Sequence, residues 1–478
     1  MILTPTLKSF LTSSSALVGY QLTVCMPFVI CAVFIGHIGS SLSLAAYGLA
    51  NTVMNMGFNG IIMGVQESLG VVCSRLYGAQ QYKDIWRYLW KSIVIAFMLS
   101  VLFSLFSIYS KGILTSIGVE EDVAIATHRL LKRASIALYF QGINQVTNNF
   151  LSAQQVTKPL FYLNFISILI IYLFAHLFIG YMQLAEIGFA YTKICQEIFN
   201  SCYYLLLIVQ YLDKSYFEAP SFDNIKENFW DFLLLNAYTT LSFYGECIAF
   251  EINIYYAALL HNVDALATWV TYINYTAFHY FISVGFGTTI RNLVGKRIGE
   301  LKIAEARDES ILYFKYIGIF SVVIIILQTH YREAIAMLFT NEPNIVLQLK
   351  ENIALYSFSV FSTFIFPGLN TLYRVVNKER FMFWSNVVAY PLSLAIFNWL
   401  FCFSLGLGIR GINLGFVGCK VIVSGILAWY LYTRVEWKYL KQVDDIRSSF
   451  HEDLIERSIS LNASIVDTEL LSRKGLYS

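Results

Sequence analysis

Two glutamates inside a long apolar segment are the residues of this sequence best suited to chemistry. Glu246 and Glu251 lie within residues 229–260, which are otherwise largely apolar. Removing a carboxylate from water disfavours its charged form, so such a group can exchange a proton near neutral pH. The charged form also attracts an organic cation. One carboxylate can therefore hold either a proton or a cation, which is the physical basis of antiport.

The two glutamates are expected to lie on different faces of a helix. Polar residues recur at a spacing of three or four along one face, which comprises Asn236, Thr239, Phe243, Glu246, Phe250 and Asn253. Glu251 follows Glu246 by five residues and is therefore rotated from it by about 140°. We expect Glu246 to bind the ion, and the alternative for either glutamate is a carboxylate held by hydrogen bonds from a neighbouring helix.

A second polar stripe lies within residues 123–153. Gln141, Asn144, Gln145 and Asn148 occupy positions i, i+3, i+4 and i+7 of a helix. This face is too polar for lipid and predicts the wall of a cavity, with hydrogen bonding between helices as the alternative. The full set of candidates for proton or substrate binding is Glu246, Glu251, Asn253, Asn236, Glu67, Gln141, Asn144, Asn148 and Tyr275.

The motifs of soluble enzymes are absent from the sequence. There is no Walker loop, no HExxH and no GxSxG, and the eight cysteines show no CxxC spacing. We therefore expect no enzymatic activity, no cofactor and no metal site, and we expect that ATP is not the energy source.

The composition identifies the elements that must position these residues. Hydrophobic residues make up 57% of the 478 residues and charged residues 13%, with a mean hydropathy of +0.59. Soluble domains are about 45–50% apolar and about 25% charged. The net charge of +2 provides no basic field for a nucleic acid. The composition excludes a typical cytosolic enzyme and a disordered chain, and it indicates a polytopic membrane protein.

Twelve segments are long and apolar enough to cross a bilayer as helices, which requires about 20 residues each. They are residues 17–35, 44–72, 90–110, 123–153, 159–181, 186–212, 229–260, 264–290, 309–330, 345–373, 381–404 and 411–435. The predicted fold is therefore an all-α polytopic membrane protein with twelve transmembrane helices.

Basic residues predict the orientation of these spans. They gather in the loops that follow even-numbered spans, at Lys83, Arg87, Lys91, Lys158, Lys214, Lys226, Lys296, Arg297, Lys302, Arg307, Lys378 and Arg380. The exceptions are Lys111, Arg332 and Arg410. Because loops rich in lysine and arginine remain in the cytoplasm, both termini are predicted to be cytoplasmic.

An internal repeat divides the spans into two sets of six. Residues 64–79 and 285–299 each carry two glycines fourteen residues apart, and the two copies are offset by 221. The same offset relates Asn149 to Asn370, and Gly188 matches Gly411 with a drift of two. These matches predict two pseudo-symmetric six-helix bundles in the same orientation.

The repeat also predicts a division of the chain and a place for the substrate. The expected parts are an N-terminal half (1–212), a cytoplasmic linker (213–228), a C-terminal half (229–435) and a cytoplasmic tail (436–478). Parallel repeats place the substrate between the halves near the bilayer midplane. We expect the Gln141–Asn148 stripe and the Asn236–Asn253 face to wall this cavity together.

Several of these motifs, in order, resemble the multidrug and toxic compound extrusion (MATE) family of secondary antiporters. The resemblance runs from about residue 20 to 435 and rests on FIGHIGSSLSLAAYGLAN at 34–51, GECIAFE at 245–251, Cys73, Tyr77, Gly78, Ala79, Gly285, Val294, Gly295 and Gly299. It implies that Glu246 couples ion movement to export and that the chain is closest to the eukaryotic, proton-coupled branch.

The sequence also departs from the family pattern. The acidic residue of the second-span signature is Gly70 in this chain, and its glutamine is Arg75. Leu293 stands for the arginine of the eighth-span motif. Cys31 and Thr363 occupy positions at which some relatives carry acids. Glu246 is left as the main candidate for ion coupling.

The predicted function is export of organic cations or xenobiotics in exchange for protons or sodium. The alternatives are a lipid-linked oligosaccharide flippase, which would need basic residues in its cavity, and a non-transporting receptor or channel. The expected partners are a small organic cation, a proton or sodium ion and the lipid bilayer, with no nucleic acid. We expect a multi-pass monomer in the plasma membrane or in a vacuolar or vesicular membrane.

Overall fold

The computed structural model describes residues 5–38, 41–116, 118–260, 263–339, 343–435 and 437, and they are almost entirely helical. The elements are α1 (Pro5–Ile38), α2 (Ser41–Met54), η1 (Asn55–Asn59), α3 (Gly60–Gly78), α4 (Tyr82–Ser116), α5 (Glu121–Ala153), α6 (Lys158–Ala175), η2 (His176–Tyr181), α7 (Ala185–Tyr211), η3 (Lys214–Tyr216), α8 (Phe222–Lys226), α9 (Phe229–Ala258), α10 (Val263–Gly299), α11 (Ile303–Phe339), α12 (Pro343–Tyr356), η4 (Ser357–Ser359), α13 (Val360–Val375), α14 (Glu379–Trp384), η5 (Ser385–Ala389), α15 (Tyr390–Asn398), η6 (Trp399–Ser404) and α16 (Gly408–Thr433).

Each of the twelve predicted spans corresponds to one long helix or to helices that run on through a π or 3-10 turn. The all-helical, twelve-span prediction is therefore confirmed. Several helices extend beyond the apolar run that predicted them. The longest extensions are in α10, which continues to Gly299, and in α11, which runs from Ile303 to Phe339. Both extensions carry charged residues, such as Lys296 and Arg297 in α10 and Glu305 and Arg307 in α11.

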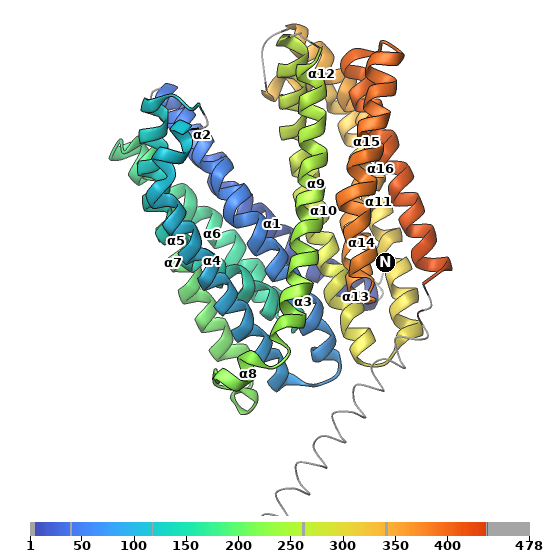
Figure 1. Ribbon diagram of the computed structural model, residues 1–478. Coiled ribbons are helices and arrows are strands. Elements are labelled where there is room, and N and C mark those ends of the chain that lie inside the picture. Colours follow the sequence, from blue (N-terminus) through green and yellow to red (C-terminus); the bar gives the residue numbers. More distant parts are fainter. Residues whose placement is uncertain are drawn as a thin grey trace, which may run out of the picture.

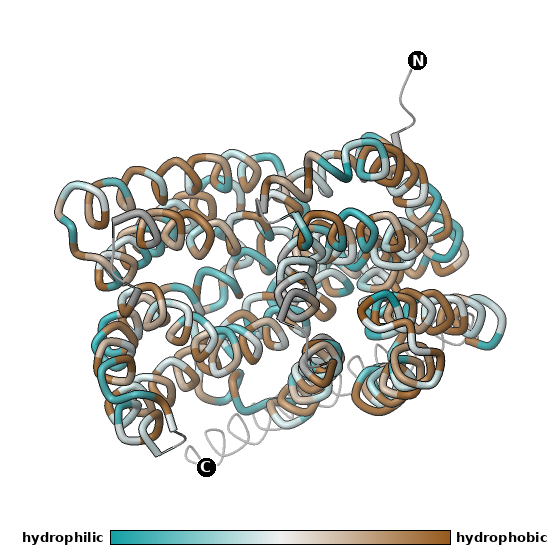
Figure 2. Tube along the Cα trace, turned by 90° about the horizontal axis from the view of Figure 1, so that it is seen from above, coloured by the Kyte–Doolittle hydropathy of each residue, from teal (hydrophilic) through white to brown (hydrophobic). Residues whose placement is uncertain are grey.

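Eight of the helical segments described are long and apolar enough to cross a membrane by composition alone. The other long helices, α5, α7, α9 and α10, are more polar along their length. They carry many of the buried polar side chains, including Asn144, Glu197, Glu246 and Arg291. Apolar residues run along most helices (Figure 2). Helices such as α6 and α11 expose them to the surroundings, at Leu169 and Ile326 for example.

The helices form two bundles, each with its own hydrophobic core. One core draws most of its residues from the first half of the chain, between Cys31 and Phe232, and the other from the second half. The bundles approach each other near α3 and diverge toward the end where α2 and α12 are labelled (Figure 1). The predicted pair of six-helix bundles is therefore present.

The first helix of each half reaches into the opposite core. Phe10 of α1 belongs to the second core, where its ring stacks on Tyr313 with 5.1 Å between centroids. Phe232 of α9 belongs to the first core. Two glycines permit these crossings, because a Cβ on Gly285 would lie 2.6 Å from the Val18 backbone and one on Gly64 would lie 2.8 Å from the Thr240 backbone. The crossings tie the two bundles together.

The repeated glycines meet where α3 and α10 end. A Cβ on Gly78 would lie 1.9 Å from the carbonyl oxygen of Lys296, and one on Gly299 would lie 1.9 Å from that of Arg75. The two backbones therefore approach too closely for any side chain at these positions. The contact is reciprocal, as expected for two copies of one motif related by a two-fold axis.

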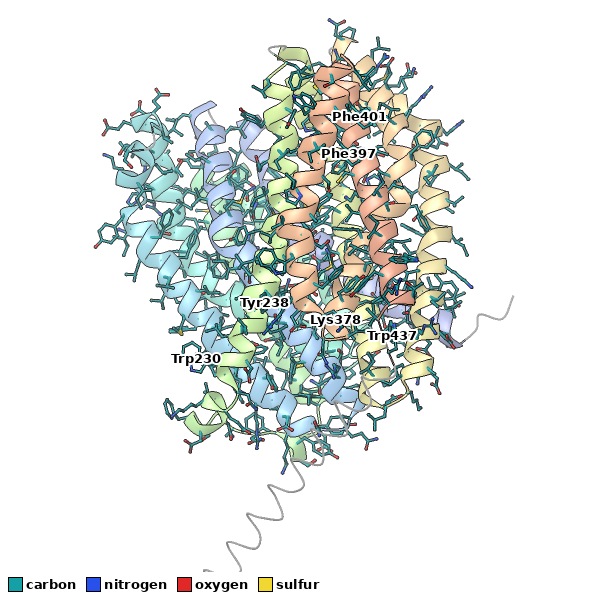
Figure 3. The ribbon with its side chains drawn as sticks, turned by 45° about the vertical axis from the view of Figure 1, so that its right-hand side comes forward. Trp230, Tyr238, Lys378, Phe397, Phe401 and Trp437 are labelled. Atoms are coloured by element: carbon teal, nitrogen blue, oxygen red, sulfur yellow. The ribbon has the colours of Figure 1, made fainter. Side chains whose placement is uncertain are left out.

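The two ends of the bundles differ in their side chains. The segment between α7 and α9, with α8, lies at the end where the halves meet. Lys378 and the exposed Trp230 lie toward this end, whereas Phe397 and Phe401 lie toward the other (Figure 3). Lys378, which belongs to one of the loops predicted to be basic, thus lies toward the same end as α8.

Candidate functional site

Glu246 lies in the interior of the second bundle and is 6% exposed. Its carboxylate accepts hydrogen bonds from the hydroxyl of Tyr280 at 3.3 Å and from Nδ2 of Asn386 at 3.0 Å. Nδ2 of Asn370 donates a third bond. These donors come from α10, η5 and α13, so three elements orient one side chain of α9. All three donors are neutral groups.

Two basic side chains accompany this carboxylate. Arg374 follows Asn370 by one turn of α13 and is 6% exposed, and Lys420 of α16 is 4% exposed. Both interact electrostatically with Glu246. The Lys420 ammonium also lies 5.0 Å from the centre of the Phe416 ring. The centre of the second bundle thus holds one acid and two bases.

The amide groups around Glu246 keep unused hydrogen-bonding capacity. The Oδ1 atoms of Asn370 and Asn386 are buried and accept no hydrogen bond from a described residue. A protonated carboxyl needs an acceptor for its own hydrogen. These oxygens can supply one if an amide rotates, so the site can solvate Glu246 in both protonation states.

The rest of the predicted face of α9 is divided among several contacts. Asn253 is fully buried and its Oδ1 accepts a bond from Asn398 at 2.6 Å. The Thr239 hydroxyl accepts a bond from Ser68 of the first half at 3.1 Å. Asn236 is buried, and neither atom of its amide group has a hydrogen-bond partner among the described residues. The face therefore packs against both halves.

Two other candidates lie apart from the Glu246 carboxylate. Glu251 is exposed, which agrees with its expected rotation away from the polar face of α9. Tyr275 is buried in the second core, and its hydroxyl donates to Oε1 of Gln328 at 2.7 Å. The structure does not bring either residue into hydrogen-bond contact with Glu246.

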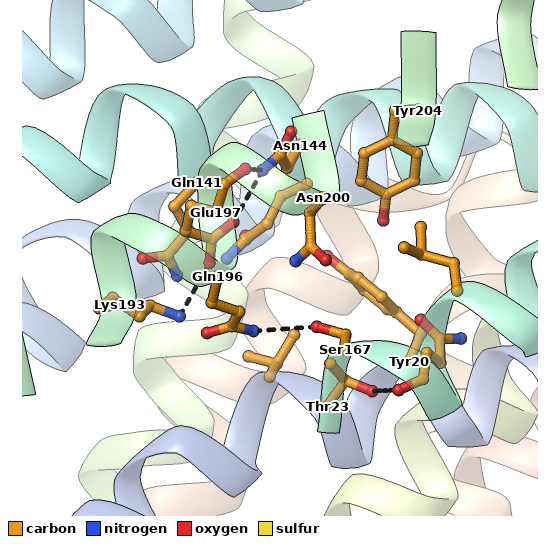
Figure 4. A pocket seen from close by; sticks show the side chains of 14 residues that line it. Tyr20, Thr23, Gln141, Asn144, Ser167, Lys193, Gln196, Glu197, Asn200 and Tyr204 are labelled. Carbon is orange, nitrogen blue, oxygen red and sulfur yellow. Dashed lines mark hydrogen bonds and ion pairs between the residues drawn. The ribbon is translucent and has the colours of Figure 1, made fainter. Parts of the chain in front are cut away.

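Gln141, Asn144 and Gln145 of the polar stripe line a pocket within the first bundle (Figure 4). Nδ2 of Asn144 donates to Oε2 of Glu197 at 2.8 Å, and Lys193 forms an ion pair with the same carboxylate at 2.9 Å. Nδ2 of Asn148 donates to the hydroxyl of Tyr204 at 3.0 Å. Hydrogen bonding between helices, the alternative, therefore accounts for much of the stripe.

Helix α3 contacts both α5 and α9. The pocket that the stripe lines is enclosed by residues of the first half alone, and a cavity shared with the α9 face stays a prediction. The stripe faces α7 of its own half, where Gln145 and Asn200 have side-chain oxygens without a donor among the described residues.

Glu67 joins the two halves. Its Oε2 lies 2.8 Å from Nη1 of Arg291, a fully buried guanidinium on α10, and its Oε1 accepts a bond from Thr288 at 3.3 Å. Arg291 also donates to Asn149 of α5. A Cβ on Gly70 would lie 2.1 Å from Cζ of Arg291. The glycine that replaces the acid of the signature thus makes room for this arginine, and Glu67 pairs with it.

Sequence reasoning missed the basic members of these sites. The span boundaries at 290 and 373 excluded Arg291 and Arg374, although the helices run on to Gly299 and Val375. Opposite charges four residues apart inside one apolar segment were a signal for the pair of Lys193 and Glu197. Asn370 was noticed only as the repeat partner of Asn149, not as a ligand of Glu246.

The MatE family model matches residues 16–201 and 239–400. Protein DETOXIFICATION 37 of Arabidopsis thaliana is 22% identical over 416 residues, which cover 86% of this chain and 81% of the relative. Protein DETOXIFICATION 20 of the same plant is 24% identical over 417 residues, covering 84% and 82%.

Solved structures share the fold. The eukaryotic MATE transporter AtDTX14 superimposes with a TM-score of 0.83 at 20% identity, covering 92% of this chain and 98% of that one. An outward-facing multidrug resistance MATE transporter gives 0.81 at 16% identity, covering 91% and 96%. Because the family model spans well over half of the sequence, the chain belongs to the MatE family of multi-pass membrane transporters.

Proposed function

We propose that this protein exports organic cations or other xenobiotics in exchange for protons by alternating access. The observation that supports this most is Glu246, a carboxylate buried in the second bundle and held by three neutral donors. Because these donors are neutral, Glu246 forms no direct ion pair with a described residue, and its carboxylate can bind a cation in competition with the electrostatic effect of Arg374 and Lys420. The names of the DETOXIFICATION relatives are in keeping with an exporter of foreign compounds.

The exchange follows from competition at one carboxylate. The charged form of Glu246 accepts all three hydrogen bonds and can face a positive group. A proton on it removes that charge and requires an acceptor, which the free oxygens of Asn370 and Asn386 provide. A proton entering from one side therefore displaces a cation, and loss of the proton on the other side restores the site.

The two halves would supply the alternation. Residues 1–212 and 229–435 would rock against each other about the contact of α3 with α10, with 213–228 as a linker that tolerates changes in end distance. Both termini and the tail 436–478 would lie in the cytoplasm, beside the basic loops. The monomer would reside in the plasma membrane or in a vacuolar or vesicular membrane.

The test is efflux of a fluorescent organic cation from proteoliposomes under imposed gradients. The wild-type protein should respond to a pH gradient, and response to a sodium gradient alone would identify sodium as the coupling ion. Glu246→Gln keeps the size of the side chain and mimics the protonated form, so pH-driven efflux should fall to the background of empty vesicles. Glu251→Gln, on an exposed position, is the matched control and should retain most of it.

Unimpaired pH-driven efflux in Glu246→Gln would remove this residue from the coupling mechanism. A melting temperature close to that of the wild type is needed to show that the loss of efflux is not a loss of folding.

The flippase alternative is weakened by the pairing of the buried bases. Holding a pyrophosphate requires several basic side chains that lack acidic partners. Lys193 and Arg291 are each neutralised, by Glu197 and Glu67. Arg374 and Lys420 stand beside Glu246. One acid and two bases leave a single excess positive charge, which is little for a head group that carries two negative charges.

A further inference from the structure

The chain that joins the two halves is fastened to the first half. Residues 213–227, here called the strap, include η3 and α8 and lie at the end of the molecule where the bundles meet (Figure 1). Nε of Arg87 in α4 donates to Oε1 of Glu218 at 2.9 Å, and Nε1 of Trp90 donates to the carbonyl oxygen of the same residue at 2.9 Å. Glu218 is therefore held through both its side chain and its backbone by one face of α4.

A second fastening lies where the strap ends. The ammonium group of Lys91, whose side chain is 3% exposed, donates to the carbonyl oxygen of Glu227 at 2.5 Å. Nη1 of Arg87 also lies 3.9 Å from Oε2 of Glu227. An ammonium group that is removed from water needs acceptors, because burial of an unpaired charge is costly. The strap supplies such an acceptor, so α4 contacts it at two separate points.

Aromatic rings strengthen the contact between the strap and α4. The Phe217 ring packs edge-on against Trp86 with 5.1 Å between centroids, and Tyr216 packs against Tyr82 at 4.8 Å. Trp86 in turn contacts Phe150 of α5 at 4.9 Å. Such aromatic pairs add to the stabilisation that comes from burying their surface. The strap is thus packed onto the core of the first bundle as well as hydrogen-bonded to α4.

The strap leaves no slack before the second half. Only Asn228 separates Glu227 from α9, which begins at Phe229. Asn228 has a φ of +50°, a left-handed conformation that asparagine tolerates, so the chain turns at this residue. One residue spans at most about 3.6 Å. The start of α9 therefore cannot move far from α4 while the strap is fastened.

We propose that the strap is a latch that holds this end of the molecule closed, and that the halves separate here only after Glu218 and Glu227 leave α4. The proposal rests on the rocking motion of the proposed function and adds a contact that controls it. Phe232 of α9 packs against Tyr88 of α4 with 5.3 Å between centroids, so opening at this end must also break a contact that the fastened strap protects. Once released, the same residues can follow a larger distance at small cost.

Limited proteolysis measures the latch directly. Lys214 and Lys226 of the strap are exposed and provide sites for trypsin. Cleavage of a segment that opens and closes rapidly follows the population of its open form. In the purified detergent-solubilised protein, Arg87→Gln should raise the rate of cleavage after Lys214 about fivefold, because a partly exposed charged hydrogen bond is lost. Arg87→Gln combined with Glu218→Gln should be cleaved little faster, because both changes remove the same contact.

A second measurement asks whether release of the strap opens the molecule. Ser74 of α3 is fully buried, so a cysteine at this position reacts with a water-soluble maleimide only when the halves separate. Arg87→Gln should raise this rate as well as the rate of cleavage. Lys83→Gln is the matched control, because Lys83 is exposed on α4 four residues before Arg87 and its substitution removes the same charge. It should leave both rates unchanged.

Two results would overturn the latch. Cleavage of the wild type as fast as that of Arg87→Gln would show that the strap is not fastened, and faster cleavage with an unchanged maleimide rate would show that it does not control opening. Phe217→Ala changes only a half-exposed side chain of the strap and decides the test if Arg87→Gln does not fold. Because both rates are read without a gradient, an absence of pH-driven efflux would contradict only the proposed exchange.

Discussion

At the scale of residues, the two halves handle buried charge in opposite ways. In the first half the Lys193 ammonium and the Glu197 carboxylate are 2.9 Å apart and each is almost fully buried. In the second half Glu246 meets neutral donors, and the bases near it are not in direct contact with it. The first arrangement pairs two opposite charges directly, whereas the second surrounds a carboxylate with neutral hydrogen-bond donors.

This contrast predicts the effect of breaking the Lys193–Glu197 pair. Glu197→Gln leaves the Lys193 ammonium buried without an acid, which should lower stability by about 3–5 kcal/mol. Adding Lys193→Met to that variant removes the stranded charge and should recover much of the loss. Thermal unfolding in detergent, followed by tryptophan fluorescence, measures both. If the single and double variants melt together, the pair is not a stabilising unit in the first bundle.

A site residue could be recognised from the sequence where apolar residues surround a polar one. Glu246 stood out because its neighbours on both sides are apolar for many residues. Arg374 did not, because it lies at the end of its span, where a charge is expected in water. Whether such a residue is solvated depends on how far the neighbouring helices extend. The length of the neighbouring helices is set by packing and cannot be read from the sequence around the residue.

At the scale of elements, the α3–α10 contact is the point where the halves touch most closely. Its glycines have no space for a Cβ, unlike Gly418 and Gly425 of α16, which have nothing within 4 Å of that position. Eight of the twelve spans are long and apolar enough to be recognised by composition alone, whereas α5, α7, α9 and α10 are more polar. The π turns η1, η2, η5 and η6 were not predictable, because they arise where a helix adjusts to its neighbours.

Because these glycines have no space for a Cβ, even an alanine substitution should disturb the α3–α10 contact. Gly78→Ala or Gly299→Ala should force the ends of α3 and α10 apart and shift the protein away from this conformation. A cysteine placed at Ser74, buried beneath this contact, should then react faster with a water-soluble maleimide. Gly418→Ala is the control and should leave the reaction rate unchanged. Equal rates in all of these variants would show that the contact does not close this end.

At the scale of the whole molecule, the proposed transport cycle requires the halves to move. Ser68 of α3 and Thr239 of α9 lie on opposite sides of the boundary, and their hydroxyl oxygens are 3.1 Å apart. That proximity makes the pair a candidate for an engineered disulfide bond. A covalent link at this point would hold the halves in the observed arrangement.

The double variant Ser68→Cys/Thr239→Cys should therefore lose efflux on oxidation and regain it on reduction, because the linked halves cannot separate. Each single cysteine variant is a control for the substitutions themselves. Cross-linking is followed by cleaving the linker and looking for a retained full-length band without reductant. Full efflux from the cross-linked protein would contradict a rocking motion about this boundary.

The reciprocal contacts of Gly78 with Lys296 and of Gly299 with Arg75 have the geometry of an isologous homodimer interface, in which each partner offers the same patch to the other. In a true homodimer, every position on the axis faces its own copy. Gly70 and Arg291 are equivalent in the repeat and touch each other, as do Glu67 and Thr288. Two identical subunits would place arginine against arginine, or glycine against glycine. In a single polypeptide the two copies can differ, so Arg291 fills the space that the missing side chain of Gly70 leaves free. The boundary between two similar halves therefore carries an arginine from only one of them.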